Sequence, residues 1–206
     1  MKARTVFLLV VALAVSSAVV SGAAPGDVPV PGKILGACDV VFTGTSTLHD
    51  FSGKGVCRPF NATVVRAAAG GKVLPTVEVE VPVAEMKTGN DSRDGKMREM
   101  FQADRFPRIR ASARDVDVDR LREEMAKDRE GKAPLDLLLR IRDVERKVRA
   151  RAGNLKESGE RITFDLEIPV SIKEFDLKAP SVLGIVRVGD KVSVKTTFTL
   201  TVSRSP

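Results

Sequence analysis

The chain has no tryptophan and no tyrosine, and only one histidine and two cysteines among its 206 residues. A zinc site of the usual Cys and His ligands needs three or four such residues, so we expect no metal site. Histidine-based catalysis would depend on His49 alone, and nine Phe supply few stacking platforms for nucleic acid. We therefore expect no catalytic residue, no cofactor and no nucleic-acid partner.

Hydrophobic and charged residues, by contrast, are plentiful. They make up 43% and 30% of the chain, and 34 Lys and Arg against 27 Asp and Glu give a net charge of +7. This composition is typical of a folded protein with a sizeable core. No shift in composition divides the chain after its N-terminal segment, so we expect one domain over residues 34–206.

The first 23 residues are typical of a secretory signal peptide. A positively charged start precedes an uncharged apolar run, which is shorter than the roughly 20 residues of a membrane-spanning helix. Ser21 and Ala23 then fit the −3 and −1 positions of a signal-peptidase site. We expect cleavage before Ala24, a flexible leader over 24–33, and a periplasmic or extracellular location. A retained membrane anchor is the alternative.

Strict alternation of apolar and polar residues dominates the rest of the chain. Residues 76–83, T-V-E-V-E-V-P-V, place four valines on one face, which indicates a half-buried strand. The same period of two returns in 135–141, 148–152, 162–170 and 192–202, and more weakly in 38–46, 54–65 and 107–116. No strand-helix-strand alternation appears, so the strands should be antiparallel, and closure would remove exposed edges. The pattern predicts an all-β, eight-stranded antiparallel barrel, closed or nearly so.

Two segments break this pattern and predict one or two short helices in loops. In 86–106, a capping region precedes Met97, Met100 and Phe101 at helical spacing. Residues 117–126 form a second, more polar candidate.

The two cysteines, Cys38 and Cys57, fall on the arms of the first expected hairpin. An exported chain meets an oxidising compartment, so we expect a disulfide between them. Two buried free thiols are the alternative.

Four blocks of sequence carry a more specific resemblance. They are 42–55, with His49, Phe51 and Gly53 in a His-x-Phe-x-Gly pattern; 81–112, with Thr-Gly-Asn, Arg-Asp and Phe-Pro elements; 137–150; and 168–200, with Pro-Ser, Leu-Gly and Val-Gly-Asp elements. In these blocks the chain resembles the YceI-like family of small exported bacterial proteins. The resemblance implies a lipocalin-like barrel, and some members of the family hold a polyisoprenoid lipid.

A ligand would then occupy the lumen and one mouth of the barrel. Ile109, Ala111 and Ala113 alternate with polar residues, and the two small side chains would leave room for an apolar chain. Flexible methionines and Phe side chains of 86–106 would close the mouth. The expected ligand-binding residues are Phe42, Leu48, His49, Phe51, Met86, Met97, Met100, Phe101, Phe106, Ile109, Ala111, Ala113 and Phe164.

These features predict a carrier or sequestration protein for a long, apolar, lipid-like ligand of the polyisoprenoid, quinone or fatty-acyl type. One alternative is a barrel filled by its own side chains that serves as an interaction or structural module of the cell envelope. An enzyme dependent on His49 is disfavoured, because His49 and Asp50 would point apart on a strand. The basic residues over 140–151 indicate a solvated hairpin face, with transient membrane-surface contact as a further alternative. The sequence leaves the oligomeric state open.

Overall fold

The computed structural model describes residues 34–47, 50–62, 65–66, 72–179 and 188–202. The expected signal peptide and leader, and the candidate ligand residues Leu48 and His49, lie outside these ranges.

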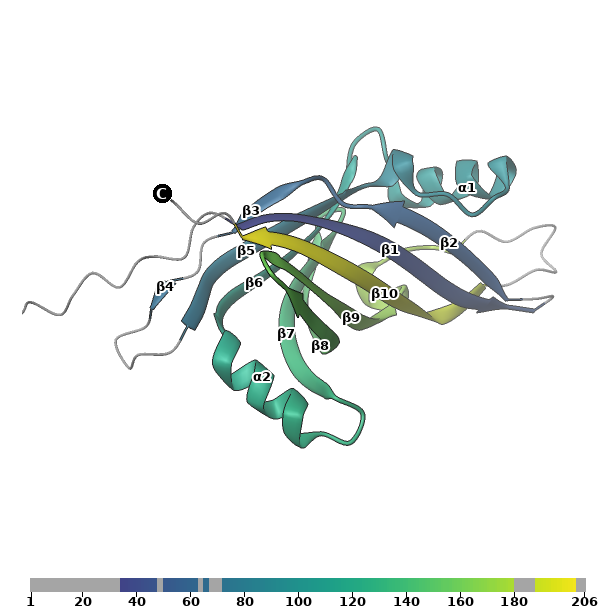
Figure 1. The fold of residues 1–206 in the computed structure, drawn as a ribbon. Helices are drawn as coiled ribbons and strands as arrows, with labels where there is room; N and C mark the ends of the chain where they lie inside the picture. The colour runs from purple at the N-terminus through teal and green to yellow at the C-terminus, as the bar shows by residue number, and fades with distance from the viewer. Residues whose placement is uncertain (1–33, 48–49, 63–64, 67–71, 180–187, 203–206) are drawn as a thin grey trace, which may run out of the picture.

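One antiparallel sheet forms most of the described chain (Figure 1). Its order is β2-β1-β10-β9-β8-β7-β6-β5-β4, and a further short strand, β3, pairs with β1. The prediction of an all-β antiparallel fold is therefore confirmed. The strands are β1 (Ile34–Ser46), β2 (Phe51–Val56), β3 (Phe60–Ala62), β4 (Val65–Arg66), β5 (Lys72–Pro82), β6 (Arg108–Asp117), β7 (Lys132–Ile141), β8 (Val144–Ser158), β9 (Arg161–Ser171) and β10 (Val188–Val202).

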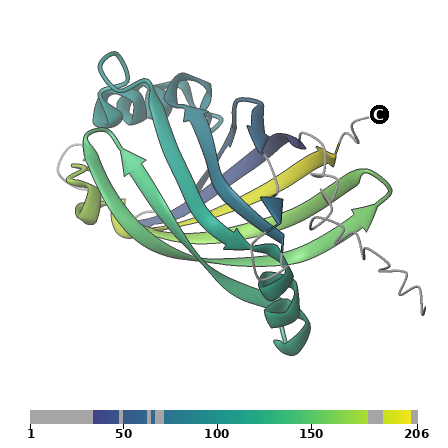
Figure 2. The ribbon, with the colours of Figure 1, turned by 90° about the vertical axis from the view of Figure 1, so that its left-hand side faces the viewer.

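The sheet curls until its two ends meet at a short seam (Figure 2). Lys54 on β2 and Lys87, just after β5, exchange two backbone hydrogen bonds of 2.7 and 2.8 Å. The backbone N–H of Arg58 donates to the carbonyl of Glu80 on β5 at 2.8 Å. Because so few bonds join the ends, the barrel is closed only locally.

The single strand expected over 54–65 is divided in the structure. β2 ends at Val56 and β3 begins at Phe60, although both pair with β1. Pro59 has no N–H for a continuous ladder, and the N–H of Arg58 turns to the seam. The division therefore lets this part of the chain contact both β1 and β5.

Both expected helices are present. They are α1 (Asp91–Phe101) and α2 (Val118–Lys127), at opposite ends of β6, and each begins with a side-chain cap. Asn90 accepts a hydrogen bond from the N–H of Arg93, and Asp117 accepts one from Arg120, both at 2.9 Å. Two short 3-10 turns, η1 (Val83–Glu85) and η2 (Lys173–Phe175), complete the described elements.

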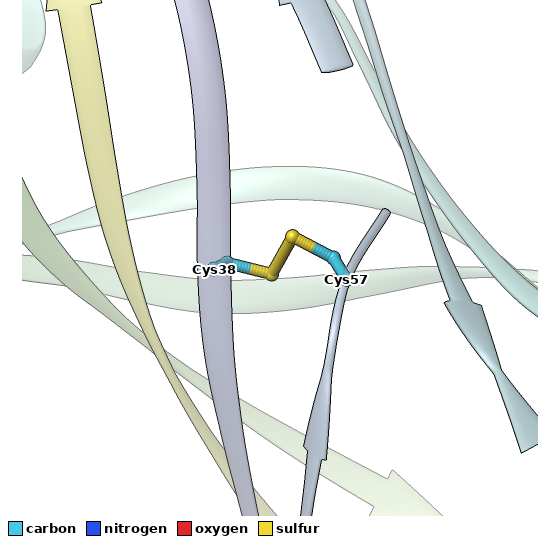
Figure 3. Close-up of a disulfide and its surroundings, with 2 residues drawn as sticks. All are labelled: Cys38 and Cys57. Carbon is cyan, nitrogen blue, oxygen red and sulfur yellow. A yellow bond between two sulfur atoms is a disulfide. The ribbon is translucent and has the colours of Figure 1, made fainter. Parts of the chain in front are cut away.

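The predicted disulfide is present and joins β1 to the segment after β2 (Figure 3). The Cα atoms of Cys38 and Cys57 lie 5.2 Å apart, and both residues are buried. Cys57 directly precedes Arg58, so the disulfide lies beside the seam.

Two glycines in the first hairpin lie beneath Phe rings of the neighbouring strand. Gly53 is paired with Phe42, and Gly44 is paired with Phe51. A Cβ atom on either glycine would overlap the ring of its partner. The His-x-Phe-x-Gly pattern is thus explained in part by packing, because the Phe covers one glycine while the Gly accommodates another Phe.

We expect Gly53→Ala to lower the free energy of unfolding by about 1–3 kcal/mol, because the added methyl group displaces the Phe42 ring. Equilibrium unfolding in urea measures the change. Gly95→Ala in α1 is the matched control, since its new Cβ meets nothing closer than 3.9 Å. Helix propensity predicts a gain of up to about 1 kcal/mol for the control. Equal effects of the two substitutions would contradict the packing argument.

Candidate ligand-binding site

An apolar cavity of about 490 Å³ lies inside the barrel. This volume is within the range typical of pockets that bind small organic molecules. Side chains of six strands form most of its walls, and Ile172 and Leu177, after β9, complete the apolar lining. The strand residues are Phe42 on β1, Phe51 on β2, Ile109 on β6, Leu139 and Ile141 on β7, Ile168 and Val170 on β9, and Val188, Val192 and Val194 on β10.

Helix α1 covers one side of this cavity with flexible apolar side chains. Met97, Met100 and Phe101 of the helix line it together with Met86, and all but Met100 are buried in the protein. Thioether side chains adapt readily to ligands of irregular shape. Polar residues form the remaining rim: Ser46, Thr88, Asn90, Ser92, Arg93 and Lys96.

A buried carboxylate holds α1 over the cavity. Asp94 is only 1% exposed, and it accepts hydrogen bonds from the Thr88 hydroxyl at 2.6 Å and the Thr88 N–H at 2.8 Å. The Thr88 hydroxyl lowers the pKa of Asp94, and the Thr88 N–H and the Lys87 ammonium, 3.9 Å away, act in the same direction against desolvation. The charged Asp94 therefore ties the first turn of α1 to the segment after β5.

We expect Asp94→Asn to lower the melting temperature at neutral pH by several degrees, because the amide accepts weaker hydrogen bonds from Thr88. The folded pKa of Asp94 is lowered, so its stabilising contribution is complete above the unfolded value of about 3.9. That contribution is lost as the pH falls through the folded pKa. Thermal melts of both proteins should therefore converge in acid. A constant difference at all pH values would contradict this role of the charge.

Two cationic side chains lie at the rim with no acidic partner among the described residues. Arg93 and Lys96 are half-buried beside the cavity, and neither side chain makes a hydrogen bond or ion pair within the described part of the chain. An apolar interior with cations at its edge suits a ligand that has a long apolar part and a polar or anionic end.

The structure brings together seven of the thirteen candidate ligand residues. Those that line the cavity are Phe42, Phe51, Met86, Met97, Met100, Phe101 and Ile109. Four others, Phe106, Ala111, Ala113 and Phe164, lie away from its walls. Leu48 and His49 are outside the described residues.

Three of the four candidates that do not line the cavity pack against other residues of the barrel. Ala111 pairs with Val79 and Leu139, both buried, and Ala113 packs against the same core. Phe164 stacks on Phe198 with ring centres 4.9 Å apart. Ala111, Ala113 and Phe164 therefore pack against neighbouring side chains, and none of them is among the residues that line the cavity.

Phe106 belongs to a different surface. The guanidinium carbon of Arg105 lies 4.9 Å from the centre of its ring, and Phe106 lines a second, smaller cavity.

Sequence reasoning missed the contribution of β7 and β10 to the cavity, and that of Ile168 and Val170 on β9. Ile168, Val170, Val192 and Val194 were assigned to the inner face of their strands by alternation. The period of two predicts which face of the sheet a residue occupies but not its position along the barrel axis. That position depends on the register between strands, which places Phe42 opposite Val194.

Neither a metal-binding cluster of side chains nor a membrane-spanning helix occurs within the described residues. They contain no group of three or more His, Cys, Asp or Glu side chains that could hold a metal ion. Within the same ranges, no helix is long and apolar enough to cross a membrane.

Solved structures share this fold. BcnA of Burkholderia cenocepacia has 17% sequence identity and a TM-score of 0.57, covering 79% of this chain and 95% of that chain. A polyisoprenoid binding domain from Saccharophagus degradans, implicated in plant cell wall breakdown, has 12% identity and a TM-score of 0.58, covering 84% and 99%. The YceI protein of Campylobacter jejuni has 16% identity and a TM-score of 0.51, covering 73% and 85%.

Comparison with curated protein sequences gives no match. The family model for the YceI-like domain, however, matches residues 37–200. Because this match spans well over half of the chain, the protein belongs to the YceI-like domain family.

Proposed function

We propose that this protein is a periplasmic carrier that sequesters a long lipid of the polyisoprenoid, quinone or fatty-acyl type. The observation that carries the proposal is the cavity, whose walls are apolar and whose charged groups lie only at the rim. Burial of the apolar chain would supply the affinity. At about 25 cal/mol per Å², removing about 300 Å² from water contributes about 7 kcal/mol before ordering costs.

The size and rim of the cavity suggest how such a ligand would lie. A methylene group is about the size of a water molecule, which takes up roughly 30 Å³. The cavity volume of about 490 Å³ therefore leaves room for a chain of many methylene groups. The apolar chain would occupy the interior, with its polar end beside Arg93 and Lys96. The polyisoprenoid binding domain from Saccharophagus degradans shares this fold, which supports a polyisoprenoid as one candidate ligand.

The location outside the cytoplasm rests on two features. The N-terminal segment has the pattern of a cleavable signal peptide, and the Cys38–Cys57 disulfide suits an oxidising compartment. Intact-mass analysis of the protein isolated from its native host should give a chain that begins at Ala24. A full-length chain recovered from the membrane fraction would contradict this location.

The experiment that tests the binding function is mass spectrometry of an organic extract of the natively purified protein. We expect one long-chain lipid per protein molecule, and we expect the delipidated protein to take up oleate or a prenyl alcohol in a saturable manner. An extract without lipid, together with no uptake of either probe, would overturn the proposal in favour of an interaction module.

A further inference from the structure

A small arginine-lined cavity lies on the opposite side of the wall from the lipid cavity. Ile109, Leu139 and Ile141 line the lipid cavity, and the arginines that alternate with them on β6 and β7 face outward. The second cavity has a volume of about 180 Å³. Its lining residues are Arg105, Phe106, Pro107, Arg108, Arg110, Arg140 and Arg142.

Acidic neighbours compensate only part of this positive charge. Glu80 pairs with Arg108 at 3.0 Å and with Arg110 at 2.8 Å, so one carboxylate serves two guanidinium groups. The hydrogen bond from Arg110 lowers the pKa of Glu80, which keeps Glu80 charged. A second carboxylate, Glu78, lies 3.9 Å from Arg110 and is more exposed.

Arg140 makes no ion pair within the described ranges, although Glu145 on β8 stands opposite it on one side. On its other side, Arg140 stands directly opposite Arg110 in the pairing of β6 with β7. Like charges directly opposite each other destabilise a sheet. Two facing arginines therefore indicate a position where an anion would relieve repulsion.

Arg142 provides an independent observation. Its Nε atom is buried and has no hydrogen-bond acceptor among the described residues. The carboxylate of Asp143 lies 3.8 Å from this atom, which is an ion-pair distance but too long for a hydrogen bond. Buried polar atoms in native proteins nearly always have a partner, so this Nε is an unsatisfied donor beside the cavity, and a rotation of the Arg142 side chain would present it to an acceptor there.

We propose that this cavity binds a phosphate group. Guanidinium groups donate paired hydrogen bonds that match the oxygens of a phosphate, and several arginines around one space favour an oxyanion with more than one charge. The volume of about 180 Å³ leaves room for a group the size of a phosphate. This site is separate from the lipid cavity, and it does not depend on the proposed carrier function.

The direct test is an NMR titration of the protein with inorganic phosphate, observed at the Nε resonances of its arginines. We expect a saturable shift at Arg142. Arg140→Gln should weaken binding about tenfold, the effect typical of losing a charge-assisted hydrogen bond. Arg142→Gln should weaken binding similarly and remove the reporting resonance.

Arg146→Gln is the matched control, because Arg146 lies on the neighbouring strand β8 and is exposed, and within the described ranges its side chain donates only to the carbonyl of Glu145. It should change the affinity less than about twofold. Arg140 is also exposed, so its replacement should leave the fold intact, and thermal melts verify this. Absence of a saturable shift, or equal weakening by Arg140→Gln and Arg146→Gln, would overturn the proposal.

Sedimentation with lipid vesicles identifies the source of the phosphate group. The experiment compares neutral vesicles of phosphatidylcholine alone with anionic vesicles of equal parts phosphatidylcholine and phosphatidylglycerol. If the wild-type protein sediments with the anionic vesicles and Arg140→Gln does not, the phosphate belongs to a lipid headgroup. If Arg140→Gln abolishes the phosphate titration but leaves sedimentation unchanged, the site takes a soluble phosphate.

Discussion

Val194→Phe is expected to reduce the bound lipid at least about tenfold while changing the free energy of unfolding by less than about 1 kcal/mol. Val194 lies between Phe42 on β1 and Ile168 on β9 in the register, and all three side chains line the cavity. The added ring would extend into space that the protein leaves empty. Lipid extraction and urea unfolding, measured on the same preparations, test both parts of the expectation.

Ala111→Phe is the matched control for this prediction. Ala111 also occupies a strand of the barrel, but it is not among the residues that line the cavity. Its cross-strand partners are Val79, which is buried outside the lining, and Leu139, which lines the cavity. A larger side chain should overpack that region and cost about 1–3 kcal/mol of stability. If Ala111→Phe instead blocked lipid uptake at no cost in stability while Val194→Phe had no effect on uptake, the cavity would be the wrong site.

Removal of the disulfide by Cys38→Ala together with Cys57→Ala is expected to cost about 3 kcal/mol of stability. The two residues are separated by 19 positions, and the loop-entropy model gives this value for a closed loop of that length. For a protein of this size, the loss corresponds to a decrease in melting temperature of about 6–12 °C. Calorimetry of the two proteins measures it.

The position of the disulfide adds a second expectation. Cys57 directly precedes Arg58, whose backbone hydrogen bond to Glu80 is one of the few that close the barrel. Loss of the cross-link should therefore loosen the seam, seen as faster amide hydrogen exchange at Arg58. A reductant should destabilise the wild-type protein and leave the double alanine variant unchanged. Equal sensitivity of the two proteins to reductant would show that the bond does not stabilise the chain.

The general architecture could be predicted from local patterns because their physical causes are local. Alternation along each strand assigned residues such as Ile109 and Val194 to one face, since successive side chains of a strand point to opposite sides. The breaks in alternation located α1 and α2, and capping at Asn90 follows from hydrogen bonds within a few residues. The disulfide was predictable because the chain offers only one pair of cysteines.

Tertiary structure alone decided which of these inward positions surround empty space. Phe164 and Ile168 lie on the same strand, yet Phe164 stacks on Phe198 while Ile168 faces the cavity. That difference depends on strand register and on the side chains supplied by distant strands, which a period of two does not encode. The same applies to the outer wall. The sequence showed basic residues on one hairpin, but only the pairing of β6 with β7 placed Arg140 opposite Arg110, because cross-strand contacts join residues far apart in the chain.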